Sequence, residues 1–357
     1  MAVEYAPRGL LGVLTPQANT TVEPELMALL PPGIAMVNAR MTSGKPDIVA
    51  RLLDYLASLD VWTTQFANAP VGAIAFACTG ASYYAGVAEE AAAVDRISAG
   101  RGVPFVTAGQ AVRDAFHALG ARRIGLVSPY PDDLTRAGIR YWKELGFDVA
   151  AVSGSVLQGK AFHPIYAMSG DGAHAALMAV DPAGLDAIVM LGTGMPTLAP
   201  ILRTPFHGGV PVFSCMLALA WRSVCTLDGV APGRENLLAW VRGEGWGERL
   251  QGRIATAERV GCARAAASAP MRPPAPVRFS TTTGWPSVSP MRSARMRAAT
   301  SVEPPGAKGT IRRIGRFGVQ AGCAARPPDN NGVQASADRM ARRLMWRFIV
   351  GLPVVLR

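Results

Sequence analysis

The sequence predicts an α/β protein of two pseudo-symmetric lobes, each with a parallel sheet flanked by helices, followed by a disordered C-terminal tail. Short apolar runs rich in β-branched residues alternate with Ala- and Leu-rich stretches of helical spacing. This alternation is typical of strands that are buried on both faces of a parallel sheet. It occurs twice along the first 245 or so residues, and neither period continues beyond them.

The predicted elements follow in regular order. The strands end in Gly, Pro, Ser, Thr or Cys and cover residues 10–14, 71–77, 124–128, 187–191 and 210–214. The helices cover residues 46–66, 83–99, 108–119 and 134–145. We therefore expect a first lobe over residues 1–110, to which 215–245 return, a second lobe over 111–214, and an active site in the cleft between them.

The charge of the chain is unevenly distributed. The net charge is +11, but residues 250–357 hold 18 Lys and Arg against 4 Asp and Glu, which leaves 18 and 21 for residues 1–249. Such a mildly acidic body has no electrostatic footprint for nucleic acid, so no nucleic-acid partner is expected for it. Residues 250–357 are expected to form a basic tail of low order, because they bury too little apolar surface to offset their chain entropy.

Two hypotheses remain open for the tail. An Arg-rich, Lys-poor, aperiodic extension is what a GC-rich gene gives when it is read out of frame, so the tail would be unselected. Limited proteolysis that leaves no stable fragment shorter than the full chain would contradict this. Alternatively, it is a regulatory segment that binds nucleic acid or an anionic membrane, although its apolar end, residues 340–357, is too short to span a bilayer.

Composition disfavours several classes of protein. The cysteines are odd in number and lack CxxC spacing, which argues against a disulfide framework and a zinc site. No run of about 18 uncharged apolar residues predicts a membrane span, and the N-terminus lacks signal-peptide features, so we expect a cytoplasmic protein. HExxH, GxSxG, Walker and GxGxxG motifs are absent.

Cys78 is the strongest candidate for chemistry. It lies in AIAFACTGASYYAG, where an apolar strand ends and a helix follows, and ligands bind at the carboxyl ends of parallel strands. The turn that starts at Thr79 offers backbone N–H groups, which can bind a carboxylate and lower the pKa of a thiol. The alternative is a buried, inert cysteine.

Three further strand ends present groups that we predict to bind substrate. In LGVLTPQANTTVEPEL, Asn19, Thr20 and Thr21 precede a helix, where such side chains bind a carboxylate or cap the helix. In GLVSPYPDDL, Tyr130 either donates its hydroxyl to a carboxylate or packs over its loop. The turn in VMLGTGMPTL places Gly192, Thr193 and Gly194 at a further strand end.

Together these segments resemble the maleate isomerase and arylmalonate decarboxylase branch of the aspartate/glutamate racemase superfamily. TPQANTTVEPE, ACTG, SPY, GTGMPT and VPVFSCMLALAW occur in the family's order over nearly all of residues 8–245. The resemblance implies two α/β lobes, no metal or organic cofactor, and a small dicarboxylate bound between two positions that often both carry cysteine. It also implies that Cys78 is the nucleophile, with Asn19 and Tyr130 helping to hold the substrate.

The chain departs from the family pattern at the second cysteine position, which is Gly192. A two-base racemase needs a thiol on each face of the substrate carbon, so an amino-acid racemase is not expected. Arylmalonate decarboxylase has the mirror arrangement, with glycine first and cysteine second. Two reactions remain: addition of the Cys78 thiolate to a cis-enedioate with rotation and elimination, or decarboxylation to an enediolate stabilised by Thr79, Thr193 and Gly194, which Cys78 protonates.

Other interpretations stay open at this point. A racemase-like pair of lobes without its second cysteine is compatible with a non-catalytic carboxylate-binding protein, or with a protein tethered through its basic tail. Cys215, at another strand terminus, is either a substitute partner for Cys78 or a core residue. His163 is expected on the surface, with the cleft as its alternative. A homo-oligomer is compatible with the sequence.

Overall fold

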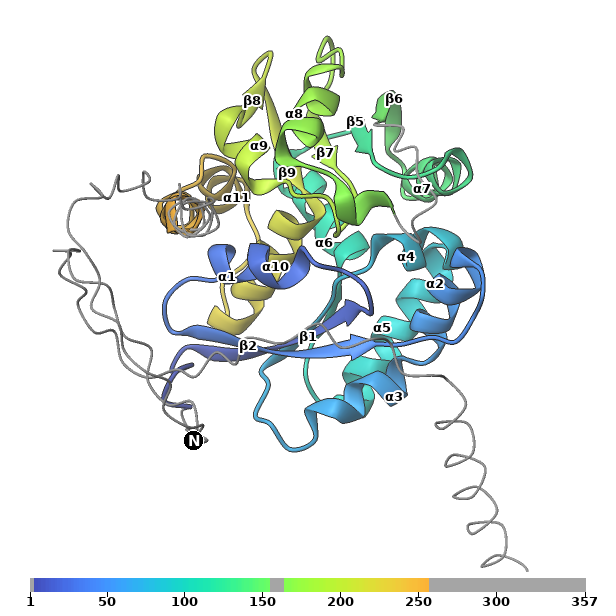
Figure 1. Ribbon diagram of the computed structural model, residues 1–357, viewed down its shortest axis with the longest axis vertical. Coiled ribbons are helices and arrows are strands. Elements are labelled where there is room, and N and C mark those ends of the chain that lie inside the picture. The colour runs from blue at the N-terminus through green and yellow to red at the C-terminus, as the bar shows by residue number, and fades with distance from the viewer. Residues whose placement is uncertain (1–2, 155–163, 257–357) are drawn as a thin grey trace, which may run out of the picture. The chain divides into compact units, whose positions relative to one another are not determined.

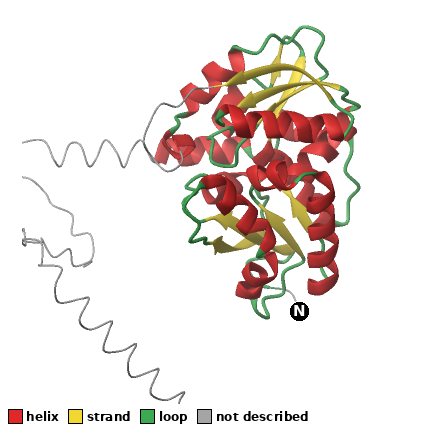
Figure 2. Cartoon of the chain, turned by 90° about the vertical axis from the view of Figure 1, so that its right-hand side faces the viewer, coloured by secondary structure: helices red, strands yellow, loops and turns green. Residues whose placement is uncertain are grey.

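The structure is a computed structural model that describes residues 3–154 and 164–256, and these residues belong to one compact unit of the chain. They form two separate sheets, with helices packed around and between them (Figures 1 and 2). The predicted two-lobed α/β class is confirmed. The expected tail lies outside the described residues from 257 onward, and its described start, residues 250–256, is the end of a helical segment that begins at residue 247.

The first sheet is wholly parallel, with strand order β2-β1-β3-β4. Its strands are β1 (Gly9–Pro16), β2 (Ile34–Met41), β3 (Ala73–Phe76) and β4 (Phe105–Thr107). The helical elements of this part of the chain are α1 (Val22–Leu29), α2 (Ile48–Ala57), α3 (Leu59–Thr63), the 3-10 turn η1 (Thr64–Phe66), α4 (Thr79–Ala85), α5 (Val87–Arg101) and α6 (Ala108–Leu119).

The second sheet has the order β6-β5-β7-β9-β8 and is parallel except for the short edge strand β8, which pairs antiparallel with β9. Its strands are β5 (Arg123–Ser128), β6 (Asp148–Gly154), β7 (Ala187–Met190), β8 (Phe206–His207) and β9 (Val210–Ser214). The remaining helical elements are α7 (Asp132–Glu144), η2 (Pro164–Ala167), α8 (Gly170–Met178), α9 (Leu198–Arg203), α10 (Cys215–Asp228) and α11 (Arg234–Val241).

Burial follows the position of each strand in its sheet. The central strands β3 and β7 are buried at every residue, whereas the edge strand β6 alternates between exposed and half-buried residues. Helices cover both faces of a central parallel strand, so its sequence is continuously apolar, while an edge strand keeps a side open to solvent. This is why the apolar runs were sufficient to predict β1, β3, β5, β7 and β9.

Helix boundaries differ from the expectation at two places. The helix expected over residues 83–99 is two helices, because α4 ends at Ala85 and the next residue, Gly86, has a φ of +86°, outside the helical region. The stretch over residues 46–66 is divided into α2, α3 and η1, with a break at Ser58. By contrast, α6 has the expected bounds, with Thr107 accepting a capping hydrogen bond from Gln110 N–H at 3.0 Å and left-handed Gly120 at its end.

Helix α10 joins the two sheets. It follows β9 of the second sheet directly, yet it contacts β1, β3 and β4 of the first sheet as well as α1 and α6. Most of its side chains are buried, including those of Trp221 and Met216. The two sheets therefore share one helix as a common core element. None of the helices in the described ranges has the length and hydropathy needed to span a bilayer.

Candidate active site

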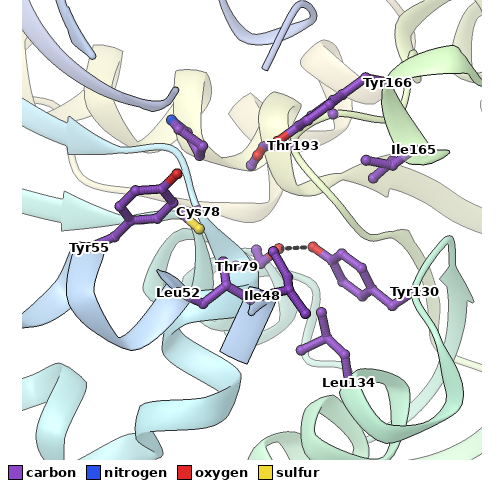
Figure 3. Close-up of a pocket in the computed structure, with 13 residues that line it drawn as sticks. Ile48, Leu52, Tyr55, Cys78, Thr79, Tyr130, Leu134, Ile165, Tyr166 and Thr193 are labelled. Atoms are coloured by element: carbon purple, nitrogen blue, oxygen red, sulfur yellow. Dashed lines mark hydrogen bonds between the residues drawn. The ribbon is translucent and has the colours of Figure 1, made fainter. Parts of the chain in front are cut away.

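A cavity lies where the carboxyl ends of β1, β3, β5 and β7 approach one another, and both lobes contribute to it (Figure 3). The first lobe contributes the turn after β3 and one face of α2, and the second contributes the turns after β5 and β7 and the η2 segment. The residues that line it are Pro16, Ile48, Leu52, Tyr55, Cys78, Thr79, Gly80, Tyr130, Leu134, Ile165, Tyr166, Thr193 and Gly194.

Cys78 occupies the N-cap position of α4, immediately after β3. Its backbone is extended, which directs the side chain into the cavity, although the residue is only 4% exposed. Burial raises the pKa of the Cys78 thiol to about 12, while the N–H groups of Ala81 and Gly80 act to lower it. The same turn thus donates to the sulfur, as the sequence predicted, but in the closed cavity desolvation outweighs the helix and the thiol keeps its proton.

Thr79 and Tyr130 meet across the cavity. The Thr79 Oγ1 atom lies 2.6 Å from the Tyr130 hydroxyl, and either group can be the donor (Figure 3). Burial is the largest cause that raises the pKa of Tyr130 well above its usual value. The Tyr130 hydroxyl is therefore protonated at neutral pH and remains a hydrogen-bond donor. Both residues line the cavity, and their role in substrate binding stays a prediction.

Thr193 links the turn after β7 to the strand that carries Cys78. Its Oγ1 donates to the Ala77 carbonyl oxygen at 2.9 Å and accepts from Asn19 Nδ2 at 3.2 Å. The other end of the Asn19 amide, Oδ1, accepts from the N–H groups of Thr21 and Val22 at 2.8 and 3.1 Å. Asn19 therefore caps the start of α1 and positions Thr193, rather than lining the cavity itself.

Two other predicted substrate-binding residues are also not among those that line the cavity. Thr20 is exposed to solvent, so the prediction that it binds substrate is not supported by its position; the inward turn of Asn19, which caps α1, leaves its neighbour facing out. Gly192 is buried with φ of +85°, and a Cβ built on it would lie 2.6 Å from Ile165 Cδ1 and 2.7 Å from Pro129 Cγ. Gly192 thus shapes the turn, and Thr193 and Gly194 present the cavity surface.

Tyr55 and Tyr166 line the cavity and were missed by sequence reasoning. Tyr55 lies beside Cys78 in Figure 3, and burial followed by the proximity of Cys78 raises its pKa to about 12. The same two causes raise the pKa of Tyr166. Tyr55 falls on the apolar face of α2, where an aromatic residue is indistinguishable from core packing, and Tyr166 lies in the short 3-10 element η2. Neither carried a signal in the sequence.

The described part of the cavity wall holds neutral donors and apolar side chains. None of its residues is Lys, Arg, His, Asp or Glu, and within residues 3–154 and 164–256 no group of His, Cys, Asp and Glu has the arrangement of a metal site. Cys215 is fully buried at the start of α10 and is not among the lining residues. His163 lies outside the described residues.

The fold and the site define a two-lobed α/β protein with one cysteine thiol in a cavity of neutral hydrogen-bond donors. Residues 11–238 match the arylmalonate decarboxylase family model, so the chain belongs to that family. This confirms the resemblance to the maleate isomerase and arylmalonate decarboxylase branch of the aspartate/glutamate racemase superfamily.

Similar proteins cover the same part of the chain. A maleate isomerase of Pseudomonas putida is 26% identical over 245 residues, which are 64% of this chain and 96% of that protein. A maleate isomerase of Nocardia farcinica is 27% identical over 242 residues, 64% of this chain and 94% of that protein. A solved Pseudomonas putida maleate isomerase with maleate has a TM-score of 0.57 at 22% identity, covering 66% of this chain and 98% of that one, and supports the fold.

Proposed function

We propose that this protein is a cofactor-independent isomerase of a small dicarboxylic acid that acts through Cys78, in the manner of a maleate cis–trans isomerase. The observation that carries the proposal is a single thiol at the N-terminus of α4, in a cavity whose opposite wall is formed by Tyr130 and Thr193 of the second lobe. The two maleate isomerases among its relatives support the same assignment.

The cavity suits a dicarboxylate held without ion pairs. The hydroxyl pair of Thr79 and Tyr130 and the N–H groups at the start of α4 are preorganised donors in a site that excludes most water, while the Thr193 hydroxyl donates to Ala77 and fixes the adjoining wall. Such donors stabilise a carboxylate and stabilise more strongly the extra charge that develops on it when an enediolate forms. The positive end of α4 adds to this effect within its first turn.

The reaction then proceeds by reversible addition. Cys78 passes its thiol proton to the bound carboxylate, the sulfur pair forms a C–S bond to one alkene carbon, and the π pair moves onto the adjacent carboxyl group as an enediolate. Rotation about the resulting C–C single bond follows. The enediolate pair re-forms the double bond in the trans geometry, the C–S bond breaks, and the sulfur recovers the proton. The substrate carboxylate is the proton acceptor because no described lining side chain is a base.

This sequence of steps needs one thiol, which serves as both nucleophile and leaving group. It is therefore compatible with Gly192 at the position where the family often has a second cysteine. The turn that holds Gly192 contributes Thr193 and Gly194 to the cavity instead. A reaction that returns a proton from the opposite face of the substrate has no second thiol to use there.

One observation favours a second candidate, the decarboxylation of a substituted malonate. A thiol whose pKa is raised to about 12 holds its proton and suits a proton donor better than a nucleophile. In this reaction the bond to one carboxyl group breaks, CO₂ leaves, the electron pair remains as an enediolate, and Cys78 gives its proton to the carbon. The thiolate recovers a proton from water before the next turnover.

The two candidates are separated by products and by covalent adducts. The full-length protein is incubated with maleate and, separately, with an arylmalonate; ¹H NMR follows fumarate formation, and released CO₂ is measured. Fumarate together with an acid-trapped adduct of one maleate on the Cys78 peptide supports the isomerase. CO₂ release without an adduct supports the decarboxylase, and neither product would refute both. The Cys225→Ala variant is a matched control, since Cys225 is a buried thiol that does not line the cavity.

A further inference from the structure

Glu25 is a buried carboxylate that the proposed chemistry does not use. It lies on α1 of the first lobe, is 6% exposed, and reaches the start of α9 in the second lobe. Its Oε1 accepts from the N–H groups of Thr197 at 2.6 Å and Leu198 at 3.2 Å. Its Oε2 lies 3.2 Å from Thr197 Oγ1. Two N–H groups of one turn thus donate to a single side chain from the other lobe, with the Thr197 hydroxyl beside them.

The turn that Glu25 binds is the one that forms a wall of the cavity. Thr193 and Gly194 line the cavity, and Thr197 follows three residues after Gly194 in the same turn. Two residues just before α1 also bond to this turn. Asn19 Nδ2 donates to Thr193 Oγ1 at 3.2 Å, and Thr21 Oγ1 donates to the Gly194 carbonyl oxygen at 2.9 Å. Glu25, one helical turn beyond Thr21, binds the other end of the same turn, at Thr197 and Leu198.

Thr197 also connects the turn after β7 to the start of α10. Thr197 Oγ1 donates to Ser214 Oγ at 2.8 Å, and Ser214 Oγ accepts from Leu217 N–H at 3.1 Å as the N-cap of α10. Thr197 and Ser214 are both completely buried. The turn is therefore attached on one side to α1 and on the other to the helix that both sheets share.

We propose that Glu25 is a positioning residue that fixes Thr193 and Gly194 against Cys78 and so preorganises the cavity wall supplied by the second lobe. The inference rests on the proposed function for its effect on turnover, but not for its effect on the wall itself. Glu25 does not touch the cavity and acts only through the turn after β7.

The Glu25 side chain can form hydrogen bonds to the turn in both its charged and its protonated form. Desolvation raises the pKa of Glu25 to about 7, and the N–H groups of Thr197 and Leu198 oppose that rise. Either form is satisfied: the two N–H groups donate to the carboxylate, and Thr197 Oγ1, which donates to Ser214, can accept from the protonated acid. Removing the side-chain oxygens would leave two buried N–H groups without an acceptor, which is costly in a closed interior.

The test uses full-length Glu25→Gln and Glu25→Met variants with two readouts. The first is the rate at which iodoacetamide alkylates Cys78 without any substrate, measured on the Cys78 peptide by mass spectrometry. The second is kcat and KM for maleate. Glu25→Met keeps the length but has no acceptor, and is expected to speed alkylation at least about threefold and to lower kcat/KM at least about tenfold. Glu25→Gln keeps an acceptor and is expected to restore both values to within about threefold.

Glu90→Met is the matched control. Glu90 is also a buried carboxylate that accepts from both lobes, through Ser82 at 2.6 Å and Tyr141, but it does not contact the turn after β7. It is expected to lower the melting temperature while leaving Cys78 alkylation within about twofold of the parent. Equal acceleration in both methionine variants would indicate general loosening and overturn the proposal.

Further outcomes are decisive as well. A folded Glu25→Met variant with parental alkylation and parental kcat/KM would overturn the proposal. Should that variant fail to fold, Glu25→Asp replaces it: the shorter carboxylate cannot reach both N–H groups, so parental values for both readouts would also overturn the proposal. If the parent protein does not turn over maleate, the proposed function fails, but faster alkylation in Glu25→Met still supports the positioning role.

Discussion

The turns after β3 and β7 occupy corresponding places in the two lobes and are built in opposite ways. After β3, only Ala77 and Cys78 precede α4, and Cys78 is its N-cap with extended backbone, φ −150° and ψ 96°. After β7, Gly192 has φ of +85° and α9 begins only at Leu198. One turn carries a thiol on a short, direct connection; the other carries hydroxyl and backbone groups on a longer one.

The difference shows that the two halves of the cavity are not interchangeable. The space into which a side chain at position 192 would point is filled by Ile165 and Pro129. A second thiol therefore could not be placed there by one substitution without moving both neighbours. The second lobe supplies a fixed wall, held by Asn19, Thr21 and Glu25 of the first lobe.

The largest expected effect tests the turn after β3. Cys78→Ala should lower turnover of the physiological substrate, or of maleate, by at least about a thousandfold, because both candidate reactions form or break a bond at the Cys78 sulfur. Product formation by NMR measures it, with Cys225→Ala as the control. Substantial activity in Cys78→Ala would show that the Cys78 thiol does not take part in the reaction.

The pH dependence of Cys78 alkylation tests whether burial or the N-terminus of α4 controls the ionisation of the thiol. With a pKa of about 12, the thiolate fraction at pH 8 is about a thousandfold below that of an ordinary thiol, whose pKa is about 8.5. Because a raised pKa keeps the protonated form at neutral pH, the alkylation rate should increase about tenfold per pH unit from pH 7 to 10. A plateau between pH 8 and 9 would mean that the helix N-terminus outweighs burial.

Gly192 and Gly209 form a matched pair for the turn after β7. Both have φ of +85°, but nothing lies within 4 Å of a Cβ on Gly209. Gly209→Ala should cost about 1 kcal/mol of unfolding free energy for the backbone alone, and Gly192→Ala about 2–4 kcal/mol because overlap is added. Urea unfolding measures both. Equal losses would show that Ile165 and Pro129 move aside easily and that the turn could accept a side chain.

The smallest expected change in kcat/KM distinguishes a threonine that lines the cavity from one on the surface. Thr79→Val removes a hydroxyl that lines the cavity and contacts Tyr130, and should lower kcat/KM about tenfold. Thr20→Val changes an exposed residue and should leave kcat/KM within about twofold. A comparable loss in Thr20→Val would return Thr20 to the substrate-binding set and require a different conformation of the turn after β1.

Local patterns were sufficient for the alternation of buried strands and helices, and for placing Cys78, Thr79, Tyr130, Thr193 and Gly194 at strand ends. The reason is general: the carboxyl ends of parallel strands share one edge of a sheet, so residues that follow strands gather there whatever the details of the loops. The same patterns could not separate Asn19 from Thr20, since both types cap helices and bind carboxylates.

The remaining features depend on contacts between residues far apart in the chain. Asn19 meets Thr193 across 174 positions and Glu25 meets Thr197 across 172, and neither pairing leaves a periodic trace in the sequence. Whether Cys78 is activated or silenced is likewise a balance between α4 and burial by the second lobe. The amino-acid order settles which groups reach the edge of each sheet; the packing of the two lobes settles which of them face one another, because desolvation and hydrogen-bond partners exist only once both lobes are in place.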